Sequence, residues 1–458
     1  MSGRQTMVAL IALAGCTRAP PQPEGPSFVP GTIHRAQSSL RGQLDRRGLI
    51  HAHSVYSHDA CDSMPEVDGV RDEVCFADFR RGLCQSQHDF VMLTDHRDAF
   101  SGTPFPEVLL HRPDRGDRLV QRGGSPTASW AACPDGTEAL ILAGAESGTM
   151  PVGLERHVGG RAERSEIYGS TSTSAIAALK AHGAVVLLQH TESWKVDDLA
   201  NLPIDGFEMY NLHANSFLGL DRIIELVLLA KDSASQLDLP HPDLAVLDFI
   251  SEDPRYLDRW SQVLARGHRR VTTMGTDCHR NSFPAKLPDG ERIDSYRRMM
   301  VWFSNHLLIR PEADGTWDDR HLKDALRAGR LYGAFEVYGY PRGFDFHARS
   351  AGAVHEMGAE VQLDDGATLV ASVPSVEGLK PHGLQPELTL RLLRATDEGW
   401  RVVTQTRDDL RHEVSQPGAY RVEVRMIPRH LKPYLAARSE TASEEDRVWI
   451  YSNPIYVR

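Results

Sequence analysis

Metal-capable side chains recur in this sequence directly after short apolar runs. His51 and His53 follow Leu49 and Ile50, and because residues two apart in a strand point the same way, both imidazoles can hold one ion. The same arrangement returns further along the chain, in Asp95-His96, Glu146, His190 and Asp277-Cys278-His279. Mixed imidazole and carboxylate ligands suit Zn, Mn or Fe. The pattern therefore predicts a metal centre that activates water for hydrolysis.

The elements that must position these side chains follow an α/β pattern. Short apolar runs alternate with helical patterns from residue 47 to about residue 330, which is typical of parallel strands joined by helices. Parallel strands in a barrel all end at one face, so side chains far apart in the sequence can converge there. The candidate strands are residues 48–51, 90–94, 140–144, 184–188, 206–210, 270–274 and 299–304, and the candidate helices are residues 174–182, 218–231 and 254–266.

The pattern of the sequence changes after about residue 332. Residues 389–394, 420–426 and 448–451 alternate apolar and polar side chains, with Gly, Pro and Asp between them. Period-two alternation broken by turn residues predicts a β-sandwich. We therefore expect a barrel over residues 47–335 and a small β-sandwich domain over residues 336–458.

The first residues resemble a bacterial export signal. An apolar run over residues 7–14 leads into Leu13-Ala14-Gly15-Cys16, which resembles a lipobox whose Cys16 would be lipidated. The alternative is a short apolar start followed by an ordinary cysteine; the run is too short to span a bilayer, which needs roughly 20 residues. We expect a signal peptide over residues 1–16, a Pro-rich tether over residues 17–46 and a lipid anchor in the membrane. The protein would then lie in the bacterial cell envelope, at the outer membrane or in the periplasm.

Net charge and cysteine content limit the partners and the compartment. The formal net charge is −11 and no basic stripe is present, so no nucleic-acid partner is expected. Of the six cysteines, all but Cys16 would meet an oxidising compartment, and this odd remainder leaves one unpaired. Cys61, Cys75 and Cys84 lie close enough in sequence to close a small loop. Cys278 is expected to be a packed neighbour of the metal site rather than a nucleophile.

Taken in order, the metal-capable motifs resemble those of the PHP (polymerase and histidinol phosphatase) superfamily. The first is His51-Ala52-His53-Ser54-Val55-Tyr56-Ser57-His58-Asp59, and the others are Thr94-Asp95-His96, Gly144-Ala145-Glu146, His190 and Gly275-Thr276-Asp277-Cys278-His279. The resemblance runs from about Leu49 to His279 and implies an α/β fold with a distorted seven-stranded (β/α) barrel. It also implies a set of metal ligands: His51, His53, Asp59, His96, Glu146, His157, His190, Asp277 and His279.

One position of the first motif departs from the family's commonest form, in which Ser is followed directly by Asp and Gly. Here Ser57 is followed by His58 and then by Asp59. Either His58 or Asp59 could therefore be the third ligand of this motif, and Asp59 is favoured.

The resemblance implies a metal-dependent hydrolase that holds two or three divalent ions. A hydroxide that bridges the metals would attack a small-molecule ester, in the first instance a phosphoester, and no separate Ser or Cys nucleophile is required. Glu208 and Asn211 are expected to orient the ligands. The candidates for binding an anionic substrate are Arg97, Arg161, Lys195 and Arg280.

Two further segments widen the range of functions. Residues 322–332 and 452–457 resemble an envelope-associated branch of the superfamily, which includes carbaryl hydrolase-like enzymes with a C-terminal β domain. This keeps open the hydrolysis of a carbamate or carboxylic ester at the same metal site. A third alternative is a catalytically inactive PHP module that serves as a binding protein at the cell envelope.

Overall fold

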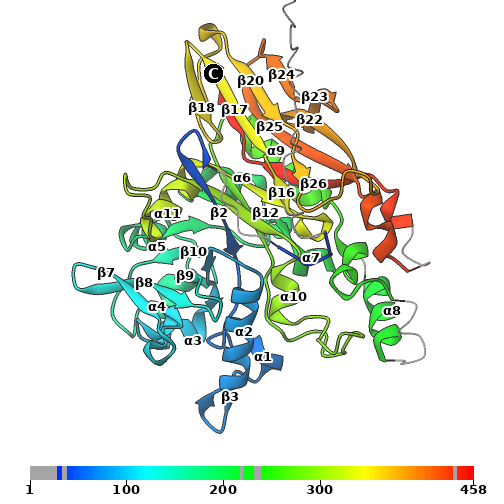
Figure 1. The fold of residues 1–458 in the computed structure, drawn as a ribbon. Helices are drawn as coiled ribbons and strands as arrows, with labels where there is room; N and C mark the ends of the chain where they lie inside the picture. The colour runs from blue at the N-terminus through cyan, green and yellow to red at the C-terminus, as the bar shows by residue number, and fades with distance from the viewer. Residues whose placement is uncertain (1–27, 34–38, 217–219, 232–238, 437–440) are drawn as a thin grey trace, which may run out of the picture.

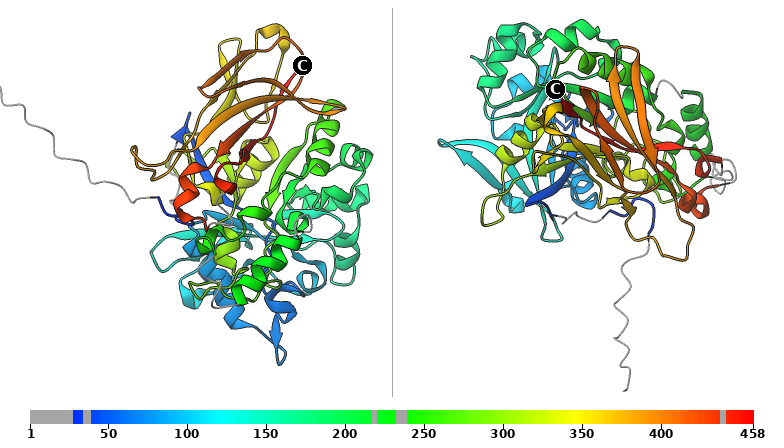
Figure 2. Two further views of the ribbon diagram at one scale, coloured as in Figure 1. Left: turned by 90° about the vertical axis from the view of Figure 1, so that its right-hand side faces the viewer. Right: turned by 90° about the horizontal axis from the view of Figure 1, so that it is seen from above.

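A computed structural model of the protein describes residues 28–33, 39–216, 220–231, 239–436 and 441–458. The expected signal peptide, Cys16 and most of the tether lie outside these residues. Within them, no helix combines the length and the apolar character needed to cross a bilayer. The strands of the C-terminal part gather at one end of the molecule, and the helix-rich remainder lies at the other end (Figures 1 and 2).

Three buried parallel strands form the centre of the N-terminal part. Strand β5 (Phe90–Met92) lies between β2 (Gln43–Ile50) and β9 (Glu138–Glu146), with Leu49 opposite Val91 and Val91 opposite Ile141. In the paired stretches, residues 48–50, 90–92 and 140–142, the residues are apolar and buried, as expected where both faces of a parallel sheet are covered. The expected strands at residues 48–51, 90–94 and 140–144 are therefore present.

The remaining strands of this part depart from an all-parallel barrel. Strand β10 (Met150–Leu154) runs antiparallel to both β9 and β11 (Val185–Leu187), and β12 (Gly206–Asn211) and β13 (Val271–Gly275) form a separate parallel pair. A few backbone hydrogen bonds attach this pair to its neighbours, among them those from Leu188 N to Gly206 O and from Glu208 N to Leu188 O on one side. Those from Asp277 N to His51 O and from His53 N to Cys278 O are on the other side. Among the described residues the strand ladders do not form a closed ring, so what is confirmed of the expected seven-stranded barrel is a mixed α/β architecture.

The last candidate strand, residues 299–304, was misplaced. Helix α10 (Tyr296–Met300) covers its start, and strand β14 (Ser304–Ile309) begins at its end and runs antiparallel to β2. The remaining strands here are β1 (Ser39–Leu40), β3 (Glu66–Val67), β4 (Val70–Arg71), β6 (Asp95–His96), β7 (Arg118–Arg122), β8 (Ser125–Ala132) and β15 (Leu331–Ala334).

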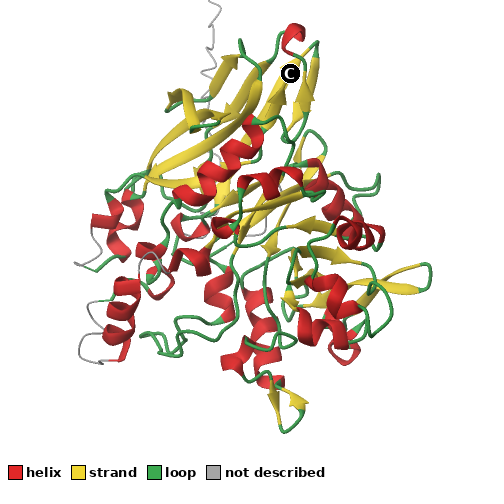
Figure 3. Ribbon diagram, turned by 180° about the vertical axis from the view of Figure 1, so that it is seen from behind, coloured by secondary structure: helices red, strands yellow, loops and turns green. Residues whose placement is uncertain are grey.

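Helices surround the strands of the N-terminal part (Figure 3). The three expected helices are present as α5 (Thr173–Ala181), α8 (Leu220–Lys231) and α9 (Pro254–Ala265). As the sequence predicts, α9 begins at Pro254, directly after Asp253, whose side chain caps the helix by accepting a hydrogen bond from Arg255 N. The others are α1 (Ala60–Ser63), α2 (Glu73–Gln85), α3 (Arg97–Gly102), α4 (Arg164–Gly169), α6 (Val196–Asn201), α7 (Leu212–Ser216) and α11 (Asp319–Ala328).

The chain beyond residue 340 consists mainly of antiparallel strands. One sheet contains β17 (Asp345–Ser350), β18 (Ala353–Glu356), β20 (Thr368–Ser372) and β24 (Leu410–Glu413). The other contains β22 (Glu387–Thr396), β23 (Gly399–Thr406), β25 (Gly418–Ile427), β26 (Arg447–Ser452) and β27 (Ile455–Val457), while β16 (Pro341–Arg342), β19 (Glu360–Val361) and β21 (Ser375–Val376) are short. Strand β26 also pairs with β15, so a ladder crosses the expected boundary at residue 335.

Besides its ladder with β12, strand β13 is held by hydrogen bonds from two asparagine side chains to its backbone. Asn305 Oδ1 accepts from Met274 N at 2.9 Å and Asn305 Nδ2 donates to Met274 O at 2.8 Å. Asn453, between β26 and β27, makes the same pair of hydrogen bonds with Thr272, at 2.9 and 2.8 Å. The C-terminal segment therefore holds a strand of the N-terminal part directly.

A fully buried ion pair joins β2 to the segment where the C-terminal part begins. Arg47 donates from Nε and Nη2 to the two carboxylate oxygens of Glu336, both at 2.5 Å, and both side chains are inaccessible to solvent. His306 Nε2 lies 3.3 Å from the same carboxylate, and its Nδ1 lies 3.0 Å from Asp45. Burial opposes ionisation, but Arg47 and His306 lower the pKa of Glu336 to about 2.

Two disulfides lie in the N-terminal part. Cys61 is bonded to Cys75, which closes the small loop anticipated from the sequence, and Cys84 is bonded to Cys133. Cys278 is free and buried, and burial raises the pKa of its thiol to about 12. It is therefore a packed thiol and not an activated nucleophile, as expected.

Glu336→Ala is expected to lower the free energy of unfolding by about 3–5 kcal/mol, because it leaves the Arg47 guanidinium buried without its counter-charge. The measurement is urea denaturation at pH 7. The pKa of Glu336 is lower in the folded protein than its ordinary value of 4.5, so its contribution is present above pH 4.5 and is lost as the pH falls toward 2.

The matched control is Glu138→Ala, which removes the exposed partner of Arg118 and should change stability by less than about 1 kcal/mol. Equal effects of the two substitutions would contradict a structural role for the buried pair.

Candidate metal centre

Most of the predicted ligands converge because they lie at or just beyond the carboxyl ends of strands. His51 and His53 come directly after β2, and Asp95-His96 forms β6, which pairs with the last two residues of β9, Ala145 and Glu146. His190 follows β11, and Asp277 and His279 follow β13. These strand ends meet in one region of the molecule, as the sequence predicts.

Four side chains each bring one possible ligand atom to a common position. His51 Nε2 and His53 Nε2 lie 3.2 Å from each other and each lies 3.2 Å from Asp277 Oδ1. Glu146 Oε2 lies 3.4 Å from His51 Nε2 and 3.3 Å from His53 Nε2. All four side chains are buried, and their ligand atoms lie within 4.8 Å of one another.

A second group forms around Asp59 and shares His53 with the first. Asp59 Oδ2 lies 3.2 Å from His96 Nε2 and 3.2 Å from His279 Nε2, while His96 Nδ1 lies 3.6 Å from Glu146 Oε2. His58 is exposed and belongs to neither group, although its ring lies against that of His96. The geometry thus brings Asp59, rather than His58, to the cluster.

Two more histidines extend the cluster toward solvent. His190 Nε2 lies 2.9 Å from Glu146 Oε1 and 3.5 Å from Asp277 Oδ2. His213 Nδ1 lies 3.3 Å from Asp277 Oδ2, and sequence reasoning missed it. A signal was present, because His213 stands two residues beyond the end of β12, where other strands deliver their ligands.

Polar neighbours fix the orientation of the buried imidazoles. His51 Nδ1–H donates to Glu208 Oε1 at 2.6 Å, and His53 Nδ1 is hydrogen-bonded to Ser57 Oγ at 2.7 Å. Each contact leaves Nε2 to face the cluster, which is the arrangement usual in metal-binding histidines. Glu208 also accepts from Asn211 Nδ2 at 3.2 Å. Glu208 therefore makes the contact with His51 that is expected of an orienting residue.

The backbone at the cluster is held in uncommon conformations. His51, His190 and Asp277 have φ values of 81°, 51° and 54°, in the left-handed region that side chains other than Gly rarely adopt. Gly275 is required nearby, because a Cβ at this position would lie 2.0 Å from Glu208 Oε1 and 3.1 Å from His51 Nδ1. The close approach of β13 to the Glu208–His51 pair thus depends on a residue without a side chain.

Several buried nitrogen and oxygen atoms of the cluster are not hydrogen-bonded to one another, and their types suit divalent ions. Asp277 Oδ1, Asp59 Oδ1 and His279 Nε2 are buried and make no hydrogen bond among the described residues. Buried polar atoms are nearly always paired, and several unpaired atoms gathered at one site are accounted for if a bound ion is their partner. Oxygen and imidazole nitrogen atoms are the donors that Zn, Mn and Fe accept. The cluster can therefore hold such ions.

The charged groups of the cluster shift one another's pKa values. Burial opposes ionisation of Asp277, but His51 and His279 hold its pKa well below the usual range. The pKa of Glu146 is also well below its usual range, because His51 and His190 outweigh the effect of burial. Burial likewise opposes protonation of His190, yet its hydrogen bond to Glu146 raises its pKa to about 9. The carboxylates thus stay anionic and draw positive charge into the cluster, which protons or metal ions can supply.

His157 is the one predicted ligand that the structure does not bring to the cluster. Its Nδ1 contacts Tyr168 Oη at 2.9 Å and its Nε2 donates to Thr103 O at 2.6 Å. Both ring nitrogens are therefore occupied, and the ring packs against Phe100 and Phe105. His157 is a satisfied structural histidine.

None of the four predicted anion-binding residues lines the hollow over the cluster. Arg97, Arg161 and Lys195 are not among the residues that line it, and Arg280 pairs with Asp78 at 3.0 Å. The cation that does line it is Arg255. The hollow is lined by Asp59, His96, Glu146, His190, Glu192, His213, Ala214, Arg255, Asp277 and His279.

Gly275→Ala is expected to weaken metal binding by roughly 10- to 100-fold, because the added Cβ displaces Glu208 from His51 and the imidazole loses its orientation. Calorimetric titration of the metal-free protein with Zn or Mn measures this. Gly160→Ala is the control, since its Cβ would have no neighbour within 4 Å. Unchanged affinity in Gly275→Ala would contradict the orienting role of Glu208.

The comparisons with known proteins give one solved structure. No family model and no curated protein matches this chain. A crystal structure from Bacteroides vulgatus, of a two-domain protein that contains a predicted PHP-like metal-dependent phosphoesterase, is similar over 94% of this chain and 99% of that chain. The sequence identity is 12% and the TM-score is 0.34. None of these comparisons supports the carbaryl hydrolase-like branch, and similarity at this level leaves the function to be argued from the site.

Proposed function

We propose that this protein is a metal-dependent hydrolase of the PHP type that cleaves phosphoesters. The observation that carries the proposal is the buried cluster of imidazoles and carboxylates, in which Asp277 Oδ1 and His279 Nε2 lack hydrogen-bond partners. The ordered motifs of the sequence support the same family. On this proposal the N-terminal strands correspond to the distorted barrel of that family, and the C-terminal strands to a β-sandwich domain.

The chain provides places for two or three ions. His51, His53, Glu146 and Asp277 would hold one, and Asp59, His96 and His279 would hold another. His190 and His213 lie beside Glu146 and Asp277 and would complete the set. When bound, divalent ions supply a nucleophile from water near neutral pH and stabilise the charge that develops during ester hydrolysis.

Arg255 is the group best placed to bind the phosphate. It lines the hollow over the cluster, and about half of its side chain is exposed. Asp253, which is buried, accepts hydrogen bonds from Arg255 Nε and Nη2, at 3.1 and 2.7 Å, and fixes the guanidinium at the start of α9. A planar guanidinium can donate two hydrogen bonds to phosphate oxygens.

The alternative functions require different residues of this site. An uncharged carbamate or carboxylic ester would need the metal ligands but not Arg255. An inactive binding module would need neither, and the complete set of donors around the two groups argues against it. Arg255→Ala separates the two ester classes, and metal-dependent turnover separates both from an inactive module.

We further propose that the protein acts in the cell envelope, anchored through lipidated Cys16. The two disulfides support export, because such bonds persist in oxidising compartments. Cys16→Ser is expected to move the protein from the membrane fraction to the soluble fraction of cells, as seen by immunoblotting. Unchanged fractionation would contradict the anchor.

His53→Ala and Asp59→Ala are each expected to lower the number of bound metal ions and to abolish turnover of p-nitrophenyl phosphate. Elemental analysis and a colorimetric assay measure the two effects. His58→Gln is the matched control from the same motif and should keep both metal content and activity, because His58 lies outside both ligand groups. A wild-type protein that remains metal-free when supplied with Zn, Mn and Fe would refute the proposal.

Arg255→Ala is expected to reduce kcat/KM for p-nitrophenyl phosphate by roughly 10- to 100-fold, the range for losing a hydrogen bond to a charged group. Turnover of p-nitrophenyl acetate should change little. Arg97→Ala, outside the hollow, is the control and should affect neither substrate. If Arg255→Ala leaves phosphate turnover unchanged and acetate is the better substrate, the enzyme is a carboxylic ester hydrolase.

A further inference from the structure

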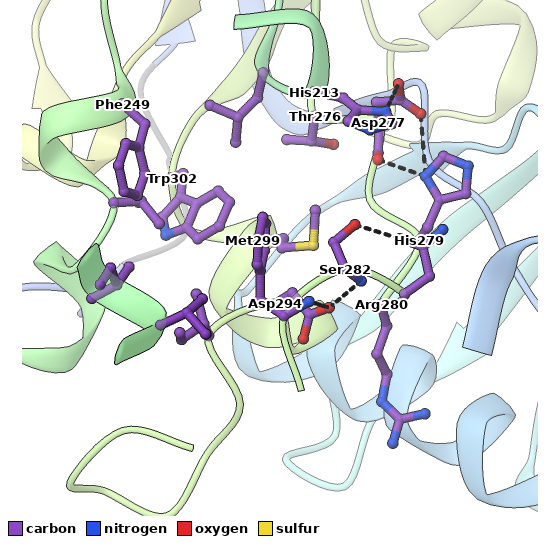
Figure 4. A pocket seen from close by; sticks show the side chains of 17 residues that line it. His213, Phe249, Thr276, Asp277, His279, Arg280, Ser282, Asp294, Met299 and Trp302 are labelled. Carbon is purple, nitrogen blue, oxygen red and sulfur yellow. Dashed lines mark hydrogen bonds and ion pairs between the residues drawn. The ribbon is translucent and has the colours of Figure 1, made fainter. Parts of the chain in front are cut away.

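A second hollow adjoins the metal centre and differs from it in character. His213, Asp277 and His279 line both hollows. Away from these shared residues its wall is largely apolar. Phe249 and Trp302 lie on one side and Asp277 and His279 on the other, with Met299 between them (Figure 4).

The other charged groups of this wall already have partners. Arg280 pairs with Asp78 at 3.0 Å. Asp294 accepts hydrogen bonds from Ser282 N at 2.8 Å and Phe283 N at 2.7 Å, and from Arg292 Nε at 2.8 Å. The second hollow therefore offers an anionic group little compensation for lost hydration, whereas apolar groups gain by leaving water there.

The lining of the hollow suits the apolar part of a small molecule. Pockets that bind such ligands are lined mostly by apolar and aromatic side chains, with a few polar groups to fix orientation. Here the polar groups gather at one end, where the metal ligands lie. A ligand that fits both hollows is apolar at one end and carries its reacting group at the other.

From this we propose that the second hollow binds the apolar organic group of the ester, so that the natural substrate is a phosphomonoester of a hydrophobic alcohol or phenol. This rests on the function proposed above and narrows its substrate class. Sugar phosphates and other polar monoesters would leave the apolar wall unfilled and would be poorer substrates.

Linear alkyl phosphates provide a direct test, because methyl, propyl and pentyl phosphate have similar leaving groups and differ in apolar length. For the metal-loaded wild type, kcat/KM is expected to rise by roughly fourfold for each methylene that enters the hollow. A kcat/KM that does not depend on chain length would overturn the proposal.

Substitutions at Val227 test whether the gain arises in this hollow. Val227 lines it from α8 and is only partly buried, so it should tolerate change. Val227→Phe should remove most of the preference for pentyl phosphate and leave methyl phosphate unchanged, whereas Val227→Ala should keep the preference. Leu228→Phe, on the adjacent residue with 62% exposure, is the control and should behave as wild type. Equal losses with methyl and pentyl phosphate in Val227→Phe would contradict the assignment.

A binding measurement separates failure of this inference from failure of the proposed function. Pentylphosphonate and methylphosphonate cannot be hydrolysed, and their affinities can be measured by calorimetry and by tryptophan fluorescence, to which Trp302 contributes. If no phosphoester is turned over, tighter binding of pentylphosphonate that Val227→Phe abolishes would still support the apolar subsite. Equal affinities of the two phosphonates would overturn it.

Discussion

Buried negative charge is the constraint on which the rest of this structure depends. Glu146, Asp277 and Glu208 are almost completely inaccessible to solvent and lie within a few ångströms of the same imidazoles. Carboxylates that leave water at such proximity need compensating positive charge. The histidines can supply part of it as protons, and the imidazole and carboxylate atoms of the cluster are donors that could accept divalent ions as the rest.

Holding these groups together imposes strain, which the surrounding structure offsets. Three residues of the cluster have left-handed backbone conformations. The strand that carries Asp277 and His279 is fastened by Asn305 and Asn453 as well as by its partner strand. Because Asn453 lies in the C-terminal segment, that segment contributes to the geometry of the site although it supplies none of the ligands.

The two hollows give the site one charged end and one apolar end. Over the cluster, Arg255 and the metal ligands provide charge, whereas the neighbouring hollow is walled by apolar side chains. A substrate with one charged and one apolar end would be aligned by both at once. On the function proposed above, such alignment would bring the reacting bond next to His190, Asp277 and His279, which come from separate segments of the chain.

The sequence by itself determined the identity and order of most cluster residues. Strand periodicity and chemistry are local properties, so an apolar run that ends in His, Asp or Glu can be recognised without the fold, and the parallel arrangement of β2, β5 and β9 follows from the same pattern. The cluster residues of the first motif, His51, His53 and Asp59, are examples.

Only the tertiary structure decided the rest, because it depends on contacts between distant segments. His157 has the right chemistry but is occupied by Tyr168 and Thr103, while Arg255 reaches the hollow because of where α9 begins. The open ladders around β12 and β13, and the pairing of β15 with β26, depend on packing between segments far apart in the chain. Local sequence patterns carry no record of such long-range geometry.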